Sequence, residues 1–525
     1  METITTEILV IGTGFGGAAT ALRMAEAGFQ VVMVEKGVNI CPERDFRQTQ
    51  DPQYLLRFIR SLRGDNVNFV YGEGLGGGSG FYEMVSLRAP TVAFEQKTGD
   101  GRRLWPAGLD RRTMDPYYAI AERMMHVRQI EPGEIPKSGL AFSLLMKRLG
   151  YSVDRVPYSV RGCVGHSYCV AGCIAGAKVT LHGTYLEPAC RAGVKILTNI
   201  EALSLCPLRS IPSDAVPERD MHRIPRRYGI RCLDSATGNP LLIEAKVVIL
   251  AGGTIGTARL LLNSRRELTM LSDHVGKNIA VNGTVKSLAI LPEDFPDGDM
   301  FTGRSHPGVI SYQFLASRGI TISTAKPLPV DAVSYANLVM EGETRTPSWW
   351  GEPKVELMKL YRRRALPIYA LGLTTPSAEL RPARRGGVLP CFHLDEEFRN
   401  YYRETLALLQ SIYRRNGARP VRISILDGEG VEYPDIHVTT AHMTGSCRMA
   451  DNPRQGVADA SGEVFRYPGL YIADGAAVPS SLAVNPYLTI LANAERIGDL
   501  LSRWYTRGRS TLMALPREAE PAGVA

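Results

Sequence analysis

A glycine-rich turn near the N-terminus has the spacing of a dinucleotide-binding motif. Its residues are Gly12, Gly14, Phe15, Gly16 and Gly17, in the pattern GxGxxG. Gly12 permits a tight turn, Gly14 lets the backbone approach a pyrophosphate, and Gly17 lets a helix pack closely on a strand. Glu35 ends the next apolar run, where an acidic side chain can hydrogen-bond a ribose hydroxyl. These residues predict a nucleotide site, although NAD and FAD would both use them.

Three apolar runs, each followed by glycine, have the composition of strands buried in a parallel sheet. They are Ile8–Ile11, Lys246–Ala251 and Gly469–Asp474. A fourth strand is expected over Val31–Val34, and helices over Ala18–Ala27, Gly256–Leu262 and Pro486–Leu501. Because these distant pieces share one pattern, the sequence predicts an α/β fold with a discontinuous Rossmann-like nucleotide-binding domain.

The pattern changes between these pieces. Residues 284–436 contain shorter alternating segments such as Val309–Phe314, with frequent Pro and Gly. This part predicts an antiparallel-sheet domain over the cofactor, where substrate binds. We therefore divide the chain into four parts: residues 1–283 with a connector at about 90–182, the substrate-binding part 284–436, the last cofactor-binding part 437–505, and a flexible tail 506–525.

Further segments identify a family by resemblance. Residues 72–79 form a second glycine-rich loop, residues 250–262 join an apolar strand to a helix, and residues 442–449 read His-Met-Thr-Gly-Ser-Cys-Arg-Met. Asn485-Pro486 follows downstream. These segments resemble the glucose-methanol-choline (GMC) flavoprotein oxidoreductases, and within them the bacterial cholesterol-oxidase-like branch. Tyr82-Glu83 departs from the branch, because sterol oxidases often carry Asn-Gly there.

The resemblance implies FAD as the cofactor and hydride transfer from an alcohol carbon to flavin N5. It implies that His442 is the base and Asn485 its partner on the substrate oxygen; Asn485 before Pro486 also fits an ordinary helix N-cap. We treat His437 and His393, which lack a motif, as structural. Besides the first turn and Glu35, the expected FAD contacts are Gly76, Gly77, Gly78, Ser79, Tyr82, Gly252, Asp474, Gly475, Asn485, Pro486 and Tyr487.

Three clustered cysteines allow two interpretations. The spacing of Cys163, Cys169 and Cys173 resembles that of a subset of bacterial dehydrogenases in this family, which carry a 3Fe-4S cluster beside the flavin. Such a cluster would pass electrons onward. The thiols also suit simple packing. A zinc site is less favoured because it needs a fourth ligand, from His166 or Cys190.

Composition limits the partners. With 61 Lys and Arg against 53 Asp and Glu spread along the chain, no basic block predicts nucleic-acid binding. No leader or long apolar span is evident, so we expect a cytoplasmic protein. The basic stretch 354–365 suits contact with a membrane surface, but a solvated helix packed on the core is favoured.

The substrate expected from the resemblance is a ring-bearing apolar secondary alcohol such as a sterol. The electrons would go to oxygen, a quinone or a redox protein. Two other functions stay open: a sugar or glycoside dehydrogenase, favoured if the cluster is real, and a lyase or photoenzyme of the same fold.

Overall fold

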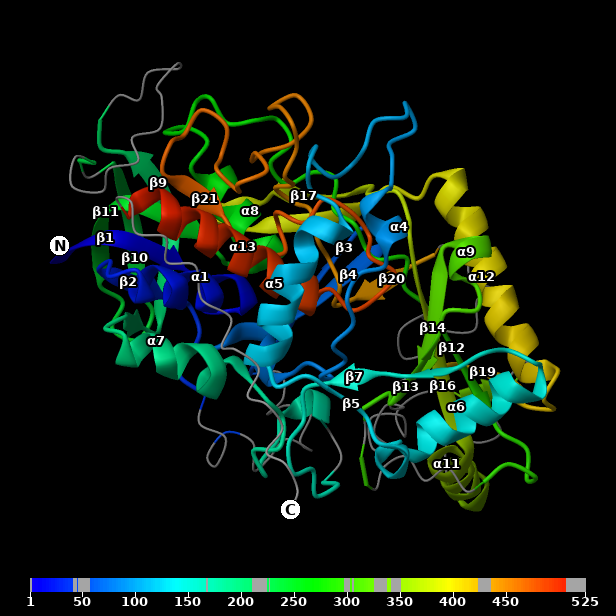
Figure 1. Ribbon diagram of the computed structural model, residues 1–525. Helices are drawn as coiled ribbons and strands as arrows, with labels where there is room; N and C mark the ends of the chain where they lie inside the picture. The colour runs from blue at the N-terminus through cyan, green and yellow to red at the C-terminus, as the bar shows by residue number, and fades with distance from the viewer. Residues whose placement is uncertain are drawn as a thin grey trace, which may run out of the picture.

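The chain folds around two large sheets that lie side by side (Figure 1). The computed structural model describes a set of segments covering most of the chain: residues 2–40, 45, 57–166, 169–209, 224–225, 227–296, 303–304, 306–324, 338–340, 351–423 and 436–506. The expected tail lies outside these residues apart from Thr506, as does part of the expected substrate-binding segment.

The first sheet has the order β8-β2-β1-β11-β10-β9, and β21 pairs with β11. Its strands are β1 (Glu2–Ile11), β2 (Val31–Val34), β8 (Lys195–Leu197), β9 (Ile200–Pro207), β10 (Tyr228–Asp234), β11 (Pro240–Leu250) and β21 (Leu470–Ile472). β1 runs parallel to both β2 and β11, and β21 runs parallel to β11. The expected α/β class is confirmed, and the three distant apolar runs do meet in one sheet.

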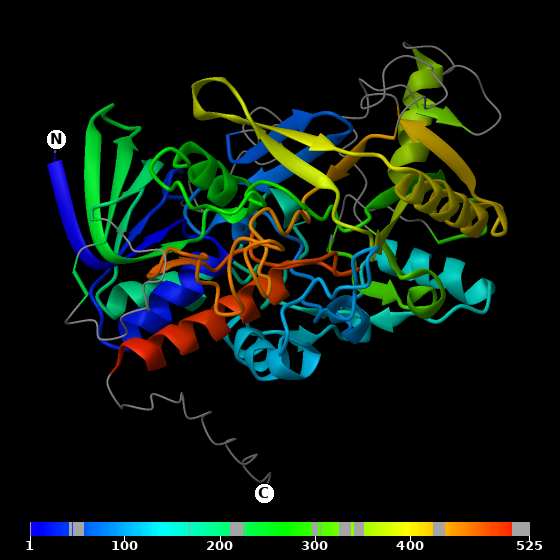
Figure 2. The ribbon, with the colours of Figure 1, turned by 90° about the horizontal axis from the view of Figure 1, so that it is seen from above.

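Helices cover this sheet and join both ends of the chain. They are α1 (Phe15–Glu26), α5 (Arg111–Met124), α7 (Glu187–Arg191), α8 (Gly253–Asn263) and α13 (Tyr487–Tyr505). Figures 1 and 2 show α1 and α13 side by side. The Arg23 guanidinium of α1 forms a two-bond ion pair with the Glu495 carboxylate of α13, at 2.6 and 2.9 Å, and both side chains are buried.

The second sheet is antiparallel, with the order β15-β19-β12-β16-β14-β13-β6. Its strands are β6 (Asp154–Arg155), β12 (Val285–Ile290), β13 (Val309–Ser311), β14 (Ile320–Thr324), β15 (Leu338–Met340), β16 (Ala365–Gly372) and β19 (Arg419–Ile423). The strand expected over Val309–Phe314 stops at Ser311 because the chain then turns into α9 (Leu315–Arg318). β6 comes from the expected connector.

The faces of this sheet differ. Ile320, Ile322, Ile368 and Ala370 pack against α6 (Lys137–Arg148) and α12 (Glu396–Arg414). The alternate residues of the same strands point to the opposite face. At the centre of that opposite face the side chains are polar. Toward one end of the face, apolar side chains form a small core that α11 (Glu352–Arg364) covers.

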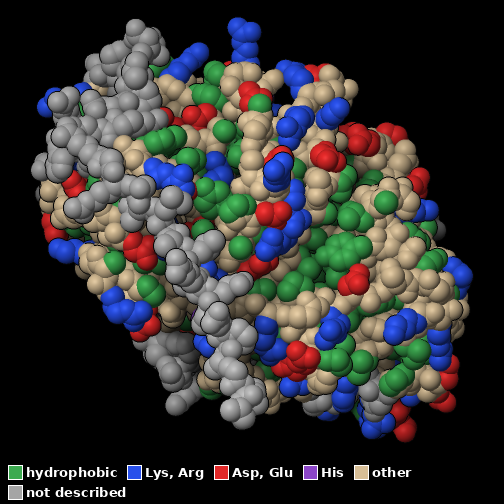
Figure 3. All heavy atoms as spheres, viewed as in Figure 1, with side chains coloured by type: hydrophobic (Ala, Val, Ile, Leu, Met, Phe, Trp, Pro, Cys, Tyr) green, Lys and Arg blue, Asp and Glu red, His purple; other side chains and the backbone are tan. Residues whose placement is uncertain are grey.

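The expected basic stretch is α11, which buries Leu357 and Tyr361 against the sheet. This packing supports the interpretation as a core-covering helix. Lys and Arg side chains alternate with Asp and Glu over the face of the molecule seen in Figure 3. In the described part of the chain, no helix combines the length and apolar character needed to cross a membrane.

Small elements connect the two halves. β3 (Ile59–Gly64), β4 (Val67–Gly72) and β20 (Val438–Thr440) form a three-stranded sheet, and β17 (Ala378–Pro382) pairs with β18 (Val388–Phe392). The remaining short elements are η1 (Gly77–Gly80), α4 (Thr91–Phe94), β5 (Arg128–Gln129), η2 (Pro132–Glu134), β7 (Pro157–Tyr158), η3 (Cys169–Ala171), η4 (His182–Leu186) and η5 (Arg384–Gly386). Pairing of β20 with β4 holds the segment before His442 beside the strand that leads into the second glycine loop.

Candidate active site

The first glycine turn lies where three parallel strands of the first sheet, β1, β11 and β21, end. Gly12 has a φ of +105°, and a β carbon there would lie 2.2 Å from the Ala251 carbonyl oxygen; one at Gly16 would lie 2.2 Å from the Ala473 oxygen. Only glycine allows these approaches. A β carbon at Gly14 would meet nothing within 4 Å, and Gly14 is the N-cap residue of α1, which no side chain caps. Free backbone N–H groups therefore remain at this helix end, as a pyrophosphate site needs.

Glu35 links the two glycine loops. Its buried carboxylate accepts hydrogen bonds from the Thr13 N–H at 3.1 Å, the Thr13 hydroxyl at 2.6 Å and the Gly37 N–H at 2.9 Å. The Thr13 hydroxyl oxygen in turn accepts the Gly76 N–H at 3.0 Å. Burial raises the pKa of Glu35, although these hydrogen bonds counteract the rise. Each carboxylate oxygen has more than one acceptor position, so a ribose hydroxyl can still donate to it.

The second glycine loop closes on the first. A β carbon at Gly77 would lie 3.1 Å from the Gly14 α carbon, whereas one at Gly78 would meet nothing within 4 Å. The Ser79 hydroxyl donates to the Gly76 carbonyl at 2.8 Å, which tightens the turn. The two glycine loops thus lie next to each other, and there is open space beside Gly14 and Gly78.

Three expected cofactor-binding aromatic residues form a cluster. Phe15, Tyr82 and Tyr487 have ring centroids 4.9 to 5.7 Å apart. The Tyr82 hydroxyl donates to the Val179 carbonyl at 2.5 Å, and the Tyr487 hydroxyl shares hydrogen bonds with Ser86 and Ser159. These contacts hold the rings in place beside the N-terminus of α1.

Asp474 joins β21 to the start of α8. Its buried carboxylate accepts from the Gly253 N–H at 2.7 Å, the Thr257 hydroxyl at 2.6 Å and the Ala476 N–H at 2.8 Å. Burial raises the pKa of this carboxyl to about 6 despite the hydrogen bonds. The side chain therefore caps α8 and positions the adjacent Gly252 and Gly475.

His442 and Asn485 come together although 43 positions separate them. The Asn485 amide nitrogen lies 3.2 Å from His442 Nε2. An amide nitrogen only donates, so Nε2 accepts and the ring proton lies on Nδ1. The structure differs from the N-cap interpretation: α13 begins at Tyr487, one residue after the expected start, and no side chain caps it. Asn485 contacts His442 instead.

Buried hydrogen bonds position both residues. Asn282 has a φ of +56°; its amide oxygen accepts the N–H groups of Leu482 and Ala483, each at 2.9 Å, and its nitrogen donates to the Val484 carbonyl at 2.9 Å. After His442, the N–H groups of Gly445, Cys447 and Met449 donate to the carbonyls of residues 475–477. The two loops that carry the pair are thereby fixed to the same framework.

The electrostatic surroundings keep His442 neutral. Burial, and then the positive charge of Lys286, lower its pKa to about 4. Lys286 lies on β12, and its ammonium donates to the Thr439 carbonyl at 3.2 Å, three residues before His442. Nδ1 is buried without a hydrogen-bond partner in the described structure. A neutral imidazole with its lone pair on Nε2 can accept a proton at ordinary pH.

The polar face of the second sheet adjoins this pair. Tyr369 lies opposite Lys286 in the register of β12 and β16, and Ser323 lies opposite Tyr369 in β14. The Thr321 hydroxyl of β14 donates to the Ala483 carbonyl at 2.5 Å, so this face contacts the loop that leads to Asn485. Desolvation lowers the pKa of Lys286 and raises the pKa of Tyr369, and the nearby Glu83 carboxylate partly offsets the first shift and adds to the second.

Three residues of the candidate active site were not predicted from the sequence: Thr13, Lys286 and His182. Thr13 was the variable position of the glycine motif, and Lys286 stands in a weakly patterned strand. His182 begins η4, and its ring is 3.0 Å from the position of a β carbon at Gly76. Its Nε2 is buried without a partner in the described structure, which suits a polar cofactor atom. No local motif surrounds it, so only the fold reveals it.

The competing histidines lie elsewhere. His393 is exposed and its Nε2 is 3.2 Å from Glu379. His437 lies just before β20, and no hydrogen bond of its ring to Asn485 or His442 is found in the described residues. His442 is therefore the histidine that contacts Asn485 in the described structure.

The three clustered cysteines share one environment. Cys163, Cys169 and Cys173 pack against a small core that includes Tyr158 and Val160. They do not gather closely enough, within the described residues, to bind a single ion, which disfavours zinc. A polynuclear cluster would place each thiolate on a different iron, so this spacing does not decide that question. Packing accounts for their positions.

Lys178 lies between the cysteines and the aromatic cluster. Its ammonium donates to the carbonyls of Gly80 and Cys169 and lies 5.6 Å from the centre of the Tyr82 ring. Burial lowers its pKa to about 8, with partial compensation from Cys169 and Cys173. The cysteine loop is thus anchored to the chain next to the second glycine loop.

Taken together, the residues fit a flavin dinucleotide. The glycine loops and the free N-terminal end of α1 suit a pyrophosphate, and Glu35 suits a ribose. The aromatic cluster, which includes Phe15, and His182, which lies next to Gly76, are beside these loops. The His442 and Asn485 pair lies at the N-terminal end of α13, where the helix dipole favours developing negative charge.

Comparison with known proteins gives the family. Residues 6–282 and 390–494 match the two models described as GMC oxidoreductase. Cholesterol oxidase of Mycobacterium tuberculosis is 24% identical, covering 98% of this chain and 93% of that protein. A long-chain-alcohol oxidase of Arabidopsis thaliana is 24% identical over 94% of this chain and 67% of its own length. The 6'''-hydroxyparomomycin C oxidase of Streptomyces lividus is 25% identical over 93% and 90%.

Solved structures share the fold. Pyridoxine 4-oxidase from Mesorbium loti gives a TM-score of 0.64 at 15% identity, covering 94% of this chain and 98% of that one. A fungal aryl-alcohol oxidase gives 0.63 at 14% identity, covering 95% and 99%. The chain therefore belongs to the GMC oxidoreductase family, whose members are FAD-dependent enzymes that oxidise alcohols.

Proposed function

We propose that the protein oxidises an alcohol to a carbonyl compound with His442 as the base. The observation that carries the proposal is the 3.2 Å contact between His442 Nε2 and the Asn485 amide nitrogen. When bound, FAD supplies the acceptor for the hydride that leaves the alcohol carbon. The substrate hydroxyl replaces the direct hydrogen bond between the two side chains: its oxygen accepts from the Asn485 amide, and its proton passes to the freed lone pair of His442 Nε2.

The rest of the site supports each role. Burial and Lys286 keep the imidazole unprotonated until it receives the substrate proton. The backbone pairing of residues 445–449 with 475–477 and the Asn282 hydrogen bonds fix the distance between base and amide. A preorganised pair of this kind lowers the barrier without reorganising during the reaction.

For the substrate, we favour an alcohol with a second polar group over a purely apolar sterol. Lys286, Tyr369 and Ser323 lie on the sheet face beside His442, and Glu83 is close enough to influence two of them. An apolar ring system could not hydrogen-bond with any of these groups, and covering them with apolar surface costs free energy. A sterol remains the alternative, since cholesterol oxidase is a relative.

We propose molecular oxygen as the electron acceptor, because the relatives named above are oxidases. Two electrons and two protons leave the alcohol, and oxygen takes them up as hydrogen peroxide. An equal yield of peroxide and carbonyl product supports this acceptor. Turnover that needs a quinone or redox protein, together with iron and acid-labile sulfide in the pure protein, would instead favour the 3Fe-4S dehydrogenase interpretation.

Replacing the base tests the mechanism. His442→Ala should retain FAD but slow anaerobic flavin reduction by an alcohol about 10²- to 10⁴-fold, the usual contribution of a general base. Stopped-flow bleaching of the flavin band measures the rate. His274→Gln, whose ring contacts Arg454 and Asn278 outside the pair, is the matched control.

An unchanged rate in His442→Ala would remove this residue from the mechanism. A wild-type flavin that no alcohol bleaches, across sterols, sugars and charged alcohols, would instead point to the lyase or photoenzyme alternative.

A further inference from the structure

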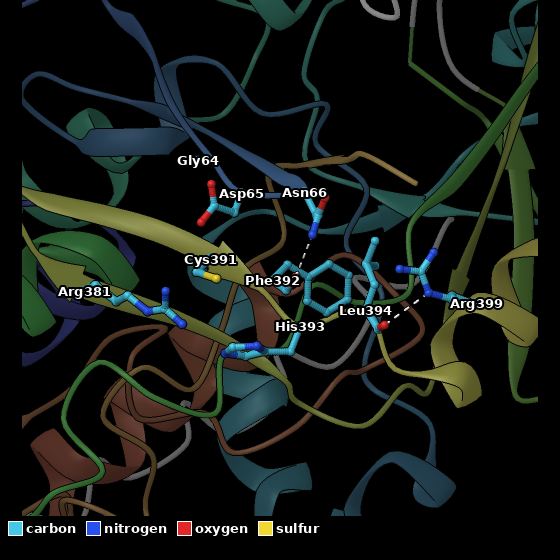
Figure 4. A pocket seen from close by; sticks show the side chains of 9 residues that line it. All are labelled: Gly64, Asp65, Asn66, Arg381, Cys391, Phe392, His393, Leu394 and Arg399. Atoms are coloured by element: carbon cyan, nitrogen blue, oxygen red, sulfur yellow. Dashed lines mark hydrogen bonds between the residues drawn. The ribbon is translucent and has the colours of Figure 1, made fainter. Parts of the chain in front are cut away.

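The hairpin of β17 and β18 carries a group of metal-ligating side chains outside the active site. It borders an open pocket of about 730 Å³, lined by Gly64, Asp65, Asn66, Arg381, Cys391, Phe392, His393, Leu394 and Arg399 (Figure 4). Nothing in alcohol oxidation uses these residues. Their donor atoms are a thiol, an imidazole and carboxylates.

The strand register brings three donors together. Glu379 lies directly opposite Cys391 in the β17–β18 pair, and His393 follows two residues later, on the same side of the chain. One ligand atom from each of the three lies within 4.8 Å of the other two. His393 Nε2 is 3.2 Å from Glu379 Oε1. Of the three side chains His393 is exposed, Glu379 is partly buried and Cys391 is buried, so closing the group around one ion would rest mainly on rotation of His393 and Glu379.

Asp65 lies beside this group on another element: its carboxylate contacts the Cys391 thiol, although it is not one of the three ligand atoms that lie within 4.8 Å of one another. The β3–β4 turn meets β18 so closely that a β carbon at Gly64 would lie 1.8 Å from the Pro390 carbonyl oxygen. Asp65 N–H donates to that oxygen at 3.1 Å, and its carbonyl accepts the Phe392 N–H at 2.9 Å. Figure 4 shows the Asp65 carboxylate on the same side of the hairpin as the Cys391 sulfur.

We propose that Glu379, Cys391, His393 and Asp65 bind a divalent transition-metal ion of the zinc class. A thiolate with an imidazole favours zinc over calcium or magnesium, and four donors complete a tetrahedral structural site. The ion replaces the proton on the thiol, so affinity rises with pH. Burial and Asp65 raise the pKa of Cys391, which the ion must overcome; Arg381 acts in the opposite direction.

Arg381 is the competitor for this site. Its guanidinium donates to Glu379 Oε1 at 2.6 Å, but the side chain is about half exposed and free to turn toward water. Glu379 Oε2 has no hydrogen bond in the described structure. An ion carrying two positive charges would displace Arg381 from the carboxylate at little cost.

The proposed ion would fasten two hairpins together. Asn66, next to Asp65, accepts the Val438 N–H at 2.9 Å, and Val438 begins the strand that precedes His442. Its side-chain amide also donates to the Phe392 carbonyl at 3.3 Å. Metal binding at this point would stabilise the folded protein in proportion to the logarithm of metal concentration.

Cobalt provides the spectroscopic test. Untagged, FAD-loaded protein, freed of metal, is titrated with Co²⁺, and the bands of tetrahedral thiolate-bound cobalt are followed at wavelengths beyond the flavin absorption. One equivalent should produce them, and Zn²⁺ should abolish them. Cys391→Ser and His393→Gln should each weaken Zn²⁺ binding by more than about 100-fold. This loss is larger than that from replacing a residue that only hydrogen-bonds to a metal ligand.

The control is Cys190→Ser, which removes an exposed thiol elsewhere and should bind as the wild type does. His393 is exposed, so His393→Gln tests the site even if Cys391→Ser fails to fold. Absence of the cobalt bands in the wild type, or equal Zn²⁺ affinity in His393→Gln, overturns the proposal. The rate of alcohol oxidation is also measured in His393→Gln. Loss of metal binding at an unchanged rate distinguishes failure of the metal site from failure of the proposed function.

Discussion

At the scale of single residues, the site depends on the protonation of one imidazole. His442 is held neutral mainly by burial and then by Lys286, on a strand of the other sheet. The sequence indicated His442 and Asn485 through their motifs. It could not indicate Lys286, Thr13 or His182, because each acquires its role from a contact made across the fold. The individual FAD contacts inferred from sequence stay predictions.

The pH dependence of the reaction follows from this neutrality. Since the base must be unprotonated, the rate of flavin reduction should fall only as pH drops toward about 4, well below the ordinary His pKa. Lys286→Met removes a positive charge that disfavours the imidazolium, so the acid limb should move to higher pH. The pH profile of anaerobic reduction measures it.

Lys359→Met, which removes an exposed ammonium paired with Glu356 on α11, is the charge-matched control. An acid limb that stays in place in Lys286→Met would show that burial alone sets the pKa of His442.

At the scale of elements, loops rather than helices and strands determine the geometry of the active site. The apolar runs predicted β2 at its observed bounds, the C-terminal parts of β1 and β11, and the central part of α8. The ends differed because hydrogen bonding to neighbours extends a strand beyond its apolar core: β1 begins at Glu2 by pairing with β11. The position of residues 482–484 depends on Asn282, about 200 residues earlier, and no local pattern reports such a bond.

Asn282→Ala should loosen this loop. Losing three buried hydrogen bonds should cost about 1–3 kcal/mol of unfolding free energy and lower kcat with FAD retained. Asn416→Ala is the matched control, because that buried amide bonds Leu145 and Ile412 in the other half of the molecule. It should lose stability at unchanged kcat. Equal kcat in both variants would argue against the positioning role.

At the scale of the whole molecule, two sheets, each built from discontinuous segments, supply the residues of the site. The two-part architecture could be predicted from the change of pattern after residue 283. The recruitment of β6 from the connector could not, because two residues carry no periodic signal. The positions of the β3–β4 and β17–β18 hairpins were likewise outside the reach of local patterns. The division into domains stays a prediction.

The buried ion pair between α1 and α13 links two elements that lie far apart in the sequence. Arg23→Ala would leave the buried Glu495 carboxylate with the Tyr185 hydroxyl as its remaining donor among the described contacts. The expected loss is about 3–5 kcal/mol of unfolding free energy, measured by urea denaturation. Arg503→Ala, which breaks an exposed pair with Asp499 on α13, should cost at most about 1 kcal/mol. Similar losses in both variants would contradict this assignment.

The pairing of β21 with β11 and of α13 with α1 also has a consequence for biosynthesis. A nascent chain that has left the ribosome as far as β11 holds both glycine loops but lacks the strand and the helix that cover them. The first sheet and its helical cover stay incomplete until residues 470–505 have emerged. We therefore expect FAD to load only after β21 and α13 have been synthesised, and a chain cut before β21 to lose the whole cofactor site rather than one helix.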